Sequence, residues 1–425
     1  MIRLKHCTFV SLLLLPTACS DGTPRQAAQV AATPASAAVA EEPHWIGTWA
    51  ASPLGFVAFD SDPAPQPFAN QTLRQKLRIS VGGDAVRIRL SNELGTTPLV
   101  IGAVTVAIAG ADSTIDAASL HALTFGGASS ITIPPGAPAV SDPVEMAVSD
   151  LAELAVSIYL PSKSAPATLH MGRTTYVAAG DGTQTAALEG AELTTNHFYL
   201  TGIYVRTTED VAVVAALGDS ITDGAGSTLH TYNAWPDHFA GRVATGAHGR
   251  AIAVVNHGIG GNQVLDDGAG VSALARFDRD VLSTPGLTHV IVLEGINDIG
   301  VGGLVFPGWT AAAPERSAAN LISGYRQLIA RAHANGLKIY GATLTPFEGT
   351  FDGYYTPAKD EVRIEVNEWI RNSGEYDGVI DFEAAIRDET NVRIMKAEYD
   401  SGDKLHPGDA GYRRMADSID TSLFQ

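Results

Sequence analysis

Three side chains that together can cleave an ester occur in this sequence. Ser220 follows an apolar run that ends at Leu217, while Asp403 and His406 stand near the other end of the chain. A serine hydroxyl is a poor nucleophile at neutral pH unless an adjacent base takes its proton. His406 can act as that base, and Asp403, three residues earlier, can reach the imidazole nitrogen that faces away from Ser220. We therefore expect acyl transfer through a serine nucleophile.

Four short segments carry these residues and other polar groups. They read LGDSITDG around Ser220, NHGIGGN at 256–262, GIND at 295–298, and DKLHPGDAGY around Asp403 and His406. In this order, the patterns GDS, N-x-G-x-x-G, G-x-N-D and D-x-x-H resemble the four blocks of the SGNH (GDSL-type) esterases and lipases. The resemblance covers the chain from about residue 211 to its C-terminus.

The resemblance also implies an oxyanion hole, because the attacked carbonyl oxygen becomes negative and needs preorganised donors. Its donors would be the backbone N–H of Ser220, the backbone N–H of Gly261 and the side-chain amide of Asn297. Gly258 and Gly260 are alternatives to Gly261, which we prefer because it ends the second block. The family needs no metal and no organic cofactor, and we expect none here.

Less specific interpretations stand beside these. Ser220 alone could cap the helix that follows it, and we expect nearby carboxylates to brace loops rather than act in catalysis. The last block places bulky Lys404 and Leu405 between the two catalytic residues, where they should shape the rim of the site. The carboxylates expected to brace loops are Asp219, Asp223 and Asp298, and we assign no catalytic role to Glu294 or His257.

The second half of the chain has the pattern of an α/β fold. The continuous apolar run at 211–218 is typical of a strand buried on both faces, and four similar runs follow at 251–258, 288–295, 337–346 and 378–382. A helix is expected around 320–333, ended by Gly336. This alternation predicts a three-layer α/β/α, flavodoxin-like domain at 207–425, with ligands at the carboxyl ends of its parallel sheet.

Residues 43–206 alternate with a period of two and predict an antiparallel β-sandwich, jelly-roll-like. In the stretch 76–92, Gly82-Gly83-Asp84 separates two alternating runs and predicts a hairpin. Trp45 and Trp49 could stack on sugars, or anchor the first strand to the core.

The first residues have the pattern of a targeting signal. A charged start, a short apolar run and the segment LPTAC predict an export signal at 1–19, followed by a flexible linker at 20–42. Lipidation at Cys19 and simple secretion both fit, so we expect a periplasmic, outer-membrane lipoprotein or secreted bacterial protein. Cys7 and Cys19 are the chain's two cysteines, which excludes disulfides, cysteine-bound zinc and a cysteine nucleophile from the folded body.

The composition and net charge limit the kinds of molecule that the protein is expected to bind. The chain has 425 residues, 45% of them hydrophobic, and a formal net charge of −18. An acidic surface disfavours nucleic acid and anionic membranes, whereas a small-molecule or carbohydrate ester suits the blocks above. We expect a serine esterase for short-chain carboxylic esters. Two alternatives stay open: a carbohydrate O-acetylesterase, or a glycan-binding surface protein with a vestigial hydrolase domain. Aromatic-rich segments at 305–310 and 346–355 could line the acyl or leaving-group pocket of the esterase, or could pack as ordinary loops.

Overall fold

A computed structural model of the chain describes residues 42–55, 66–166, 168–244, 250–305 and 312–425. Residues 41–425 cluster as one compact unit. The expected export signal, the site of lipidation and nearly all of the expected linker lie outside the described residues, so these remain predictions. The segment 305–310 also falls outside them except for Val305.

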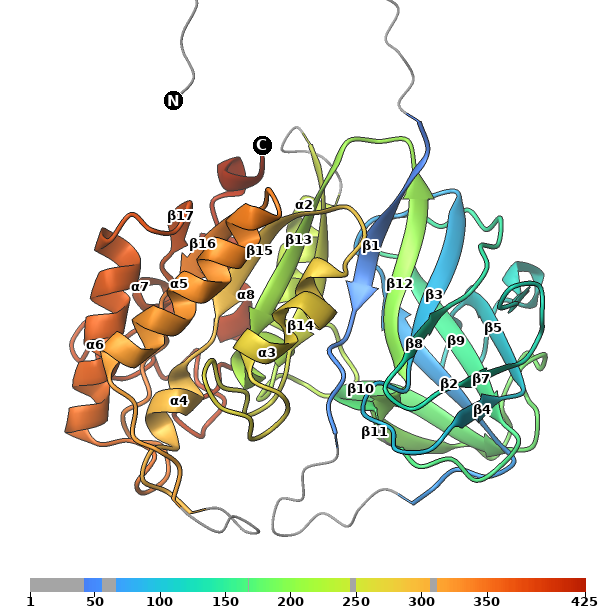
Figure 1. The fold of residues 1–425 in the computed structure, drawn as a ribbon, viewed down its shortest axis with the longest axis horizontal. Helices are drawn as coiled ribbons and strands as arrows, with labels where there is room; N and C mark the ends of the chain where they lie inside the picture. The colour runs from blue at the N-terminus through green and yellow to red at the C-terminus, as the bar shows by residue number, and fades with distance from the viewer. Residues whose placement is uncertain (1–41, 56–65, 167, 245–249, 306–311) are drawn as a thin grey trace, which may run out of the picture. The chain divides into compact units, whose positions relative to one another are not determined.

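Antiparallel strands build the first half, as the period-two pattern predicts (Figure 1). Two main sheets face a shared apolar core, with strand orders β1-β12-β3-β8 and β11-β10-β2-β9-β5-β6, and β4 and β7 form a separate pair. The strands are β1 (His44–Ala50), β2 (Gln71–Arg78), β3 (Ala85–Ser91), β4 (Leu99–Ile101), β5 (Ala103–Ile108), β6 (His121–Leu123), β7 (Ile131–Ile133), β8 (Pro138–Val140), β9 (Glu153–Leu160), β10 (Leu169–Ala179), β11 (Glu192–Phe198) and β12 (Leu200–Thr207), and a short 3-10 helix η1 spans Ala117–Ser119.

The predicted hairpin at 76–92 is wrong. β2 pairs with β9 and β10, whereas β3 pairs with β12 and β8, so the chain crosses from one sheet to the other between them. Neither Gly82 nor Gly83 takes the positive φ that a tight hairpin turn needs. Instead, a Cβ atom on Gly82 would lie 2.1 Å from the carbonyl oxygen of Val148. The glycines allow close approach to a neighbouring backbone rather than a turn.

The two tryptophans of β1 belong to the packing of this half. The Arg87 guanidinium lies 4.3 Å from the ring centre of Trp45, and the ring of Trp49 lies 5.7 Å from that of His197. Both tryptophans are half-buried. These contacts favour their role as anchors of the first strand.

A five-stranded parallel sheet forms the second half. Its order is β14-β13-β15-β16-β17, which is the 2-1-3-4-5 order of flavodoxin-like folds. The apolar runs at 211–218 and 251–258 coincide with the first two strands. The strands are β13 (Val211–Gly218), β14 (Ala251–Gly258), β15 (Leu287–Leu293), β16 (Lys338–Ala342) and β17 (Gly378–Ile380).

Helices cover both faces of this sheet, which makes the three layers (Figure 1). On one face α5 packs against α3 and α6, and on the other α2 packs against α8 and β14. The expected helix at 320–333 is α5, and Gly336 follows it with a φ of 71°. The helices are α1 (Ser220–Asp223), α2 (Trp235–Val243), α3 (Ala273–Phe277), η2 (Asp278–Leu282), α4 (Ile296–Gly300), α5 (Ala318–Ala334), α6 (Pro357–Asn372), α7 (Phe382–Ile386), α8 (Asp409–Ser418) and η3 (Thr421–Phe424).

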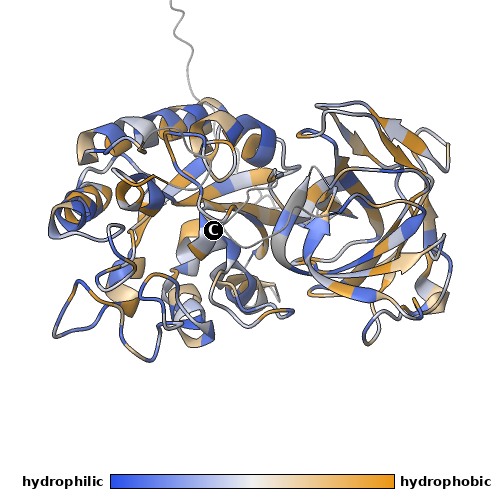
Figure 2. Cartoon of the chain, turned by 90° about the horizontal axis from the view of Figure 1, so that it is seen from below, coloured by the Kyte–Doolittle hydropathy of each residue, from blue (hydrophilic) through white to orange (hydrophobic). Residues whose placement is uncertain are grey.

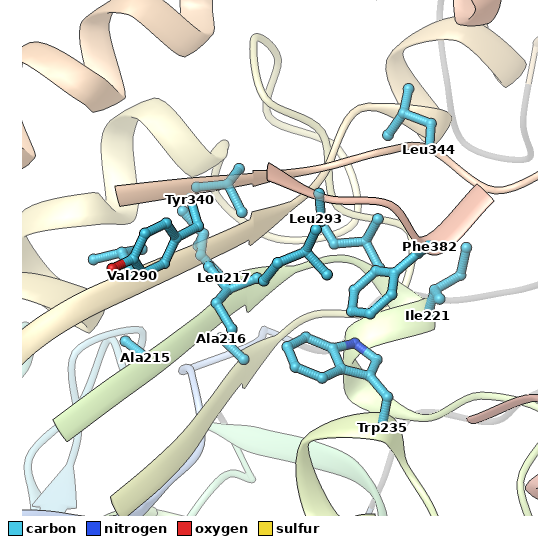
Figure 3. Packing of buried hydrophobic residues seen from close by; sticks show 14 of the residues in the cluster. Ala215, Ala216, Leu217, Ile221, Trp235, Val290, Leu293, Tyr340, Leu344 and Phe382 are labelled. Carbon is cyan, nitrogen blue, oxygen red and sulfur yellow. The ribbon is translucent and has the colours of Figure 1, made fainter. Parts of the chain in front are cut away.

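The core of this half fixes the ends of the strands. Figure 3 shows Leu217 and Leu293, near the ends of neighbouring strands, among apolar side chains of the strands and of the helices α1, α2 and α7. The rings of Trp235 and Phe382 lie 5.3 Å apart, and Ile221, the residue after Ser220, is buried beside them. Figure 2 shows helices with alternating hydrophilic and hydrophobic residues, as amphipathic cover for a sheet requires.

The core of the antiparallel half continues into the parallel sheet. Val213 and Ala253 belong to the same buried apolar cluster as Ile46 of β1, and the Gly47 N–H donates to the Pro285 carbonyl at 2.8 Å. Within the described ranges, none of the helices has the length and apolar character needed to cross a membrane.

Candidate active site

Ser220 lies two residues after the end of β13, an inner strand of the parallel sheet, at the N-terminus of the short helix α1. Asp219 caps this helix, because its carboxylate accepts a hydrogen bond from the Ile221 N–H at 2.8 Å. The cap is therefore Asp219 and not Ser220, whose side chain is left for other partners. Since Ser220 is the first helical residue, its N–H has no partner within the helix.

His406 and Asp403 meet Ser220 across the 186 residues that separate the imidazole and the hydroxyl in sequence. The His406 Nε2 atom lies 2.8 Å from the Ser220 Oγ atom, and the His406 Nδ1 atom lies 2.6 Å from Asp403 Oδ2. The other Asp403 oxygen accepts from the backbone N–H groups of Leu405 and His406. Although burial opposes it, these hydrogen bonds and the His406 charge hold the pKa of Asp403 well below its usual range.

An ionised Asp403 decides which imidazole nitrogen carries the proton. A carboxylate only accepts hydrogen bonds, so the Nδ1 atom of His406 is the protonated one. The Nε2 atom then has a free lone pair toward the Ser220 hydroxyl, which donates to it. This is the arrangement that general-base activation of a serine requires.

The second and third blocks follow strands on either side of β13. Gly218 pairs with Gly258 at the end of β14 and with Leu293 at the end of β15, so all three chains leave the sheet at one edge. Gly261 has a φ of 74° and makes no hydrogen bond from its N–H to another described residue. The left-handed conformation favours glycine there. Asn297 lies on α4, four residues after β15.

The Asn297 side chain is held from two sides. Its Nδ2 group donates to the Asn262 carbonyl at 2.9 Å, and its Oδ1 atom accepts from the Tyr354 hydroxyl at 2.8 Å. Asn262 in turn donates its own amide to the carbonyls of Ala269 and Val271. The side chain of Asn262 thus fixes its loop.

A buried arginine joins the loops of the first two blocks and faces the residue that precedes the third. The Arg276 guanidinium donates to the Gly218 carbonyl at 3.0 Å, the His257 carbonyl at 2.8 Å and the Asn262 Oδ1 atom at 2.8 Å. Its charge faces Asp280 at 3.3 Å and Glu294 at 3.5 Å, and all three of these side chains are fully buried. Arg276 therefore determines how the ends of β13 and β14 lie relative to each other.

The nearby carboxyl groups behave as structural groups. Asp298 accepts from the N–H groups of Val264 and Leu265 at 2.8 and 3.0 Å, and burial raises its pKa to about 7. Burial likewise raises the pKa of Asp219 to about 7 and that of Glu294 well above its usual value. The expected loop bracing through backbone N–H groups therefore holds for Asp219 and Asp298.

Asp223 departs from this expectation, because its partners come from the antiparallel half. The His170 Nε2 atom on β10 lies 3.2 Å from Asp223 Oδ1, and Arg173 Nη2 lies 3.5 Å from the same oxygen. Arg173 also donates to the Asp223 backbone carbonyl at 3.2 Å. Burial raises the pKa of Asp223 to about 6, against the lowering effect of Arg173.

The segments around the site have distinct roles. The segment at 346–355, expected to line a pocket, contains Tyr354, whose hydroxyl donates a hydrogen bond to Asn297. It also contains the exposed Phe351. Lys404 pairs with Asp400, whereas Leu405 is buried in the core and does not form part of a rim, contrary to expectation. Two cavities lie between the halves, and neither is lined by Ser220, Asp403 or His406.

Sequence reasoning missed Arg276, Tyr354, His170 and Arg173. The position of Arg276 as a lone arginine in the apolar run at 271–277 was a weak signal. The aromatic cluster at 346–355 was a weak signal for Tyr354. Nothing near His170 or Arg173 points to the nucleophile's helix. Across the described residues, no group of three or more His, Cys, Asp or Glu side chains could hold a metal ion.

Comparison with known proteins assigns the domain. Residues 216–414 match the GDSL-like Lipase/Acylhydrolase family, and this stretch contains all four blocks. The second half of the chain is a GDSL-type hydrolase domain. Its parallel sheet, the position of Ser220 after the first strand and the C-terminal Asp403–His406 pair agree with this match, and the matched domain is an ester hydrolase.

Solved structures similar to the chain include other proteins of this kind. One is a lipolytic-family G-D-S-L protein of Desulfitobacterium hafniense, 23% identical, covering 49% of this chain and 97% of its own, with a TM-score of 0.36. An acetyl xylan esterase variant from Geobacillus stearothermophilus is 24% identical, covering 48% and 91%, with a TM-score of 0.37. A GDSL-like lipase from Bacteroides thetaiotaomicron is 17% identical, covering 50% and 87%, with a TM-score of 0.34. No functionally curated protein matches the sequence.

Proposed function

We propose that the protein is a serine esterase that hydrolyses short-chain carboxylic esters through an acyl-enzyme on Ser220. The observation that carries this proposal is the continuous chain of contacts from Asp403 through His406 to Ser220, at 2.6 and 2.8 Å. Such a chain serves to move a proton from a hydroxyl to an imidazole whose positive charge a carboxylate stabilises.

The reaction divides into two acyl transfers. The Ser220 oxygen attacks the ester carbonyl carbon while its proton passes to His406 Nε2. His406 then returns that proton to the departing alcohol, whose bond to the carbonyl carbon breaks, and Ser220 holds the acyl group. Water loses a proton to His406 and attacks the acyl carbon, which releases the acid and restores the Ser220 hydroxyl.

The tetrahedral intermediate in each step carries a negative oxygen. We assign its donors to the backbone N–H groups of Ser220 and Gly261 and to the second N–H of the Asn297 amide. All three groups follow strands that end at one edge of the sheet, and the first two N–H groups lack partners that would compete. Losing one such donor typically lowers kcat by about 100- to 1000-fold.

The preference for short acyl chains follows from the surface beside His406. A Cβ atom on Gly226 would lie 3.0 Å from the His406 Cβ atom, so the segment 226–231 begins beside His406. This segment and its neighbour at 401–404 are largely polar and exposed, with Leu229 as the exposed apolar exception. A long acyl chain would gain little from burial against such a surface.

The test is hydrolysis of 4-nitrophenyl acetate by the wild type and by Ser220→Ala. We expect the variant to keep the wild-type melting temperature and to lose turnover by at least about 10⁴-fold. Ser227→Ala, which removes a hydroxyl that donates to the Gly224 carbonyl at 2.6 Å, is the matched control and should stay active. Wild-type turnover by the Ser220 variant would overturn the proposal.

Substrate profiling decides the ester class. In a series of 4-nitrophenyl esters, kcat/KM should peak between about two and six acyl carbons. Each further CH₂ group contributes its usual ~0.8 kcal/mol only where apolar surface buries it. Higher kcat/KM on acetylated polysaccharides than on simple acetates would instead favour the carbohydrate O-acetylesterase. A peak near ten or more carbons would indicate a lipase.

A further inference from the structure

The Asn297 amide has one N–H bond to spare. An amide nitrogen carries two hydrogens, and one of them is used at 2.9 Å by the Asn262 carbonyl. The other makes no hydrogen bond to the described residues, although Asn297 is only 6% exposed. The Oδ1 atom is occupied by the Tyr354 hydroxyl at 2.8 Å. The amide is therefore anchored through both ends and still has a donor to offer.

Tyr354 is held tightly against the helix that carries Asn297. It is 2% exposed, and a Cβ atom on Gly300 of α4 would lie 2.2 Å from the ring carbon that bears the hydroxyl. The Lys359 ammonium donates to the carbonyls of Gly300 and Gly353 at 2.7 and 2.5 Å, which ties α4 to the residue before Tyr354. The glycine thus makes room for a ring whose hydroxyl cannot leave Asn297 without repacking.

This contact opposes rotation of the amide. An exchange of the amide oxygen and nitrogen would place Oδ1 against the Asn262 carbonyl, so that two acceptors would face each other. Donation by Tyr354 to Oδ1 also polarises the amide and strengthens its N–H groups as donors. Burial, together with the carboxyls of Asp219 and Asp298, raises the pKa of Tyr354 well above its usual value, so the hydroxyl keeps its proton.

We propose that Tyr354 is a positioning residue that orients the Asn297 amide toward the oxyanion of the tetrahedral intermediate. The inference rests on the proposed function, because it concerns the same reaction. Tyr354 itself does not touch the reacting atoms. Its removal should therefore affect the transition state more than substrate binding.

The test is Tyr354→Phe, which removes the hydroxyl and keeps the ring. We expect kcat for 4-nitrophenyl acetate to fall by about tenfold or more, a fraction of the loss on deleting an oxyanion donor, with KM within about twofold. The inhibition constant of phenylboronic acid, which forms a tetrahedral anion on serine, should rise by a similar factor. Tyr199→Phe is the control, since it too loses the hydroxyl of a buried tyrosine, in this case one that donates to the Ala165 backbone carbonyl at 2.8 Å.

A double-variant cycle separates positioning from a general structural effect. In an Asn297→Ala background the Tyr354→Phe change should have no further effect on kcat, because the group it positions is gone. An equal loss in both backgrounds, or wild-type kcat and boronate binding in Tyr354→Phe, would overturn the inference.

Gly300→Ala provides a second route if Tyr354→Phe folds poorly. The added methyl group should displace the ring and lower kcat in the same way, and unchanged kcat with native folding would contradict the inference. Failure of the proposed function would look different: the wild type would lack esterase activity, or Ser220→Ala would retain it.

Discussion

The His170 Nε2 atom, on β10 of the antiparallel half, lies 3.2 Å from the Asp223 carboxylate at the end of the helix that begins with Ser220. Arg173, on the same strand, contacts both this carboxylate and the Asp223 backbone carbonyl. The antiparallel half therefore touches the helix that carries Ser220, the proposed nucleophile. It does so with one cation and one imidazole, whose pKa burial and the Arg173 charge keep well below its usual value.

Replacing Arg173 should destabilise the protein and slow turnover. In Arg173→Met the buried Asp223 carboxyl loses the positive charge beside it, and we expect the free energy of unfolding to fall by about 1–3 kcal/mol. Urea unfolding followed by circular dichroism measures this change. Adding Asp223→Asn should restore part of the loss, because a neutral amide needs no counter-charge.

The matched control for that experiment is Arg206→Met. Arg206 pairs with Asp84 and Glu145 on the surface of the antiparallel half, with carboxylates 58% and 72% exposed. Such pairs contribute at most about 1 kcal/mol. If Arg173→Met were no more destabilising than Arg206→Met, the contact between β10 and the helix of Ser220 would be energetically irrelevant.

His257 should make the stability depend on pH. It is buried with its ring nitrogens near the hydroxyls of Ser52 and Thr284, and burial lowers its pKa from 6.5 to about 4. Between these values the unfolded chain binds the extra proton and the folded protein does not. The contribution of neutral His257 to the free energy of unfolding is complete above pH 6.5 and is lost as the pH falls toward 4. The free energy of unfolding should fall by about 2 kcal/mol between pH 7.5 and 5.

Unfolding of the wild type and of His257→Asn at both pH values isolates this effect. The raised pKa of Asp298, about 7, acts in the opposite direction in the same window, but it is common to both proteins. The stability difference between wild type and variant should shrink at pH 5. A difference that is the same at both pH values would show that His257 does not contribute to the pH dependence.

Arg276 should be one of the most sensitive positions in the domain. Arg276→Ala leaves the buried carboxyls of Asp280 and Glu294 without their shared cation, and frees three backbone or amide acceptors. We expect a loss of about 3–5 kcal/mol in the free energy of unfolding. Arg276→Lys should recover little, since an ammonium cannot reproduce the planar fork. A loss below 1 kcal/mol in the alanine variant would contradict this assignment.

The sequence predicted the parts of the protein that depend on local pattern. The continuous apolar runs at 211–218 and 251–258 became β13 and β14, and the alternating first half became antiparallel sheets. The hairpin at Gly82-Gly83 failed because a period of two does not specify which sheet a strand joins. In this chain β3 pairs with β8 and with β12, the latter more than a hundred residues later.

The supporting contacts of the site could not be predicted for a related reason. Tyr354 and Asn297 are 57 residues apart, and Asp223 is 50 residues from Arg173. No local spacing relates such pairs. Tyr354 and Asn297 meet because strand order brings distant loops to one edge of the parallel sheet, and Arg173 meets Asp223 because the two halves pack together. The four blocks were recognisable because each one is short and contiguous.

Covalent labelling tests the central assignment, Ser220 as the acyl acceptor, most directly. A fluorophosphonate forms a stable tetrahedral adduct with an activated serine, and peptide mass spectrometry locates it. The contact between His406 and Ser220 predicts a single adduct on Ser220 in the wild type, and its disappearance in His406→Ala, where the hydroxyl has lost its base. An adduct on another residue, or equal labelling of Ser220 without His406, would contradict it.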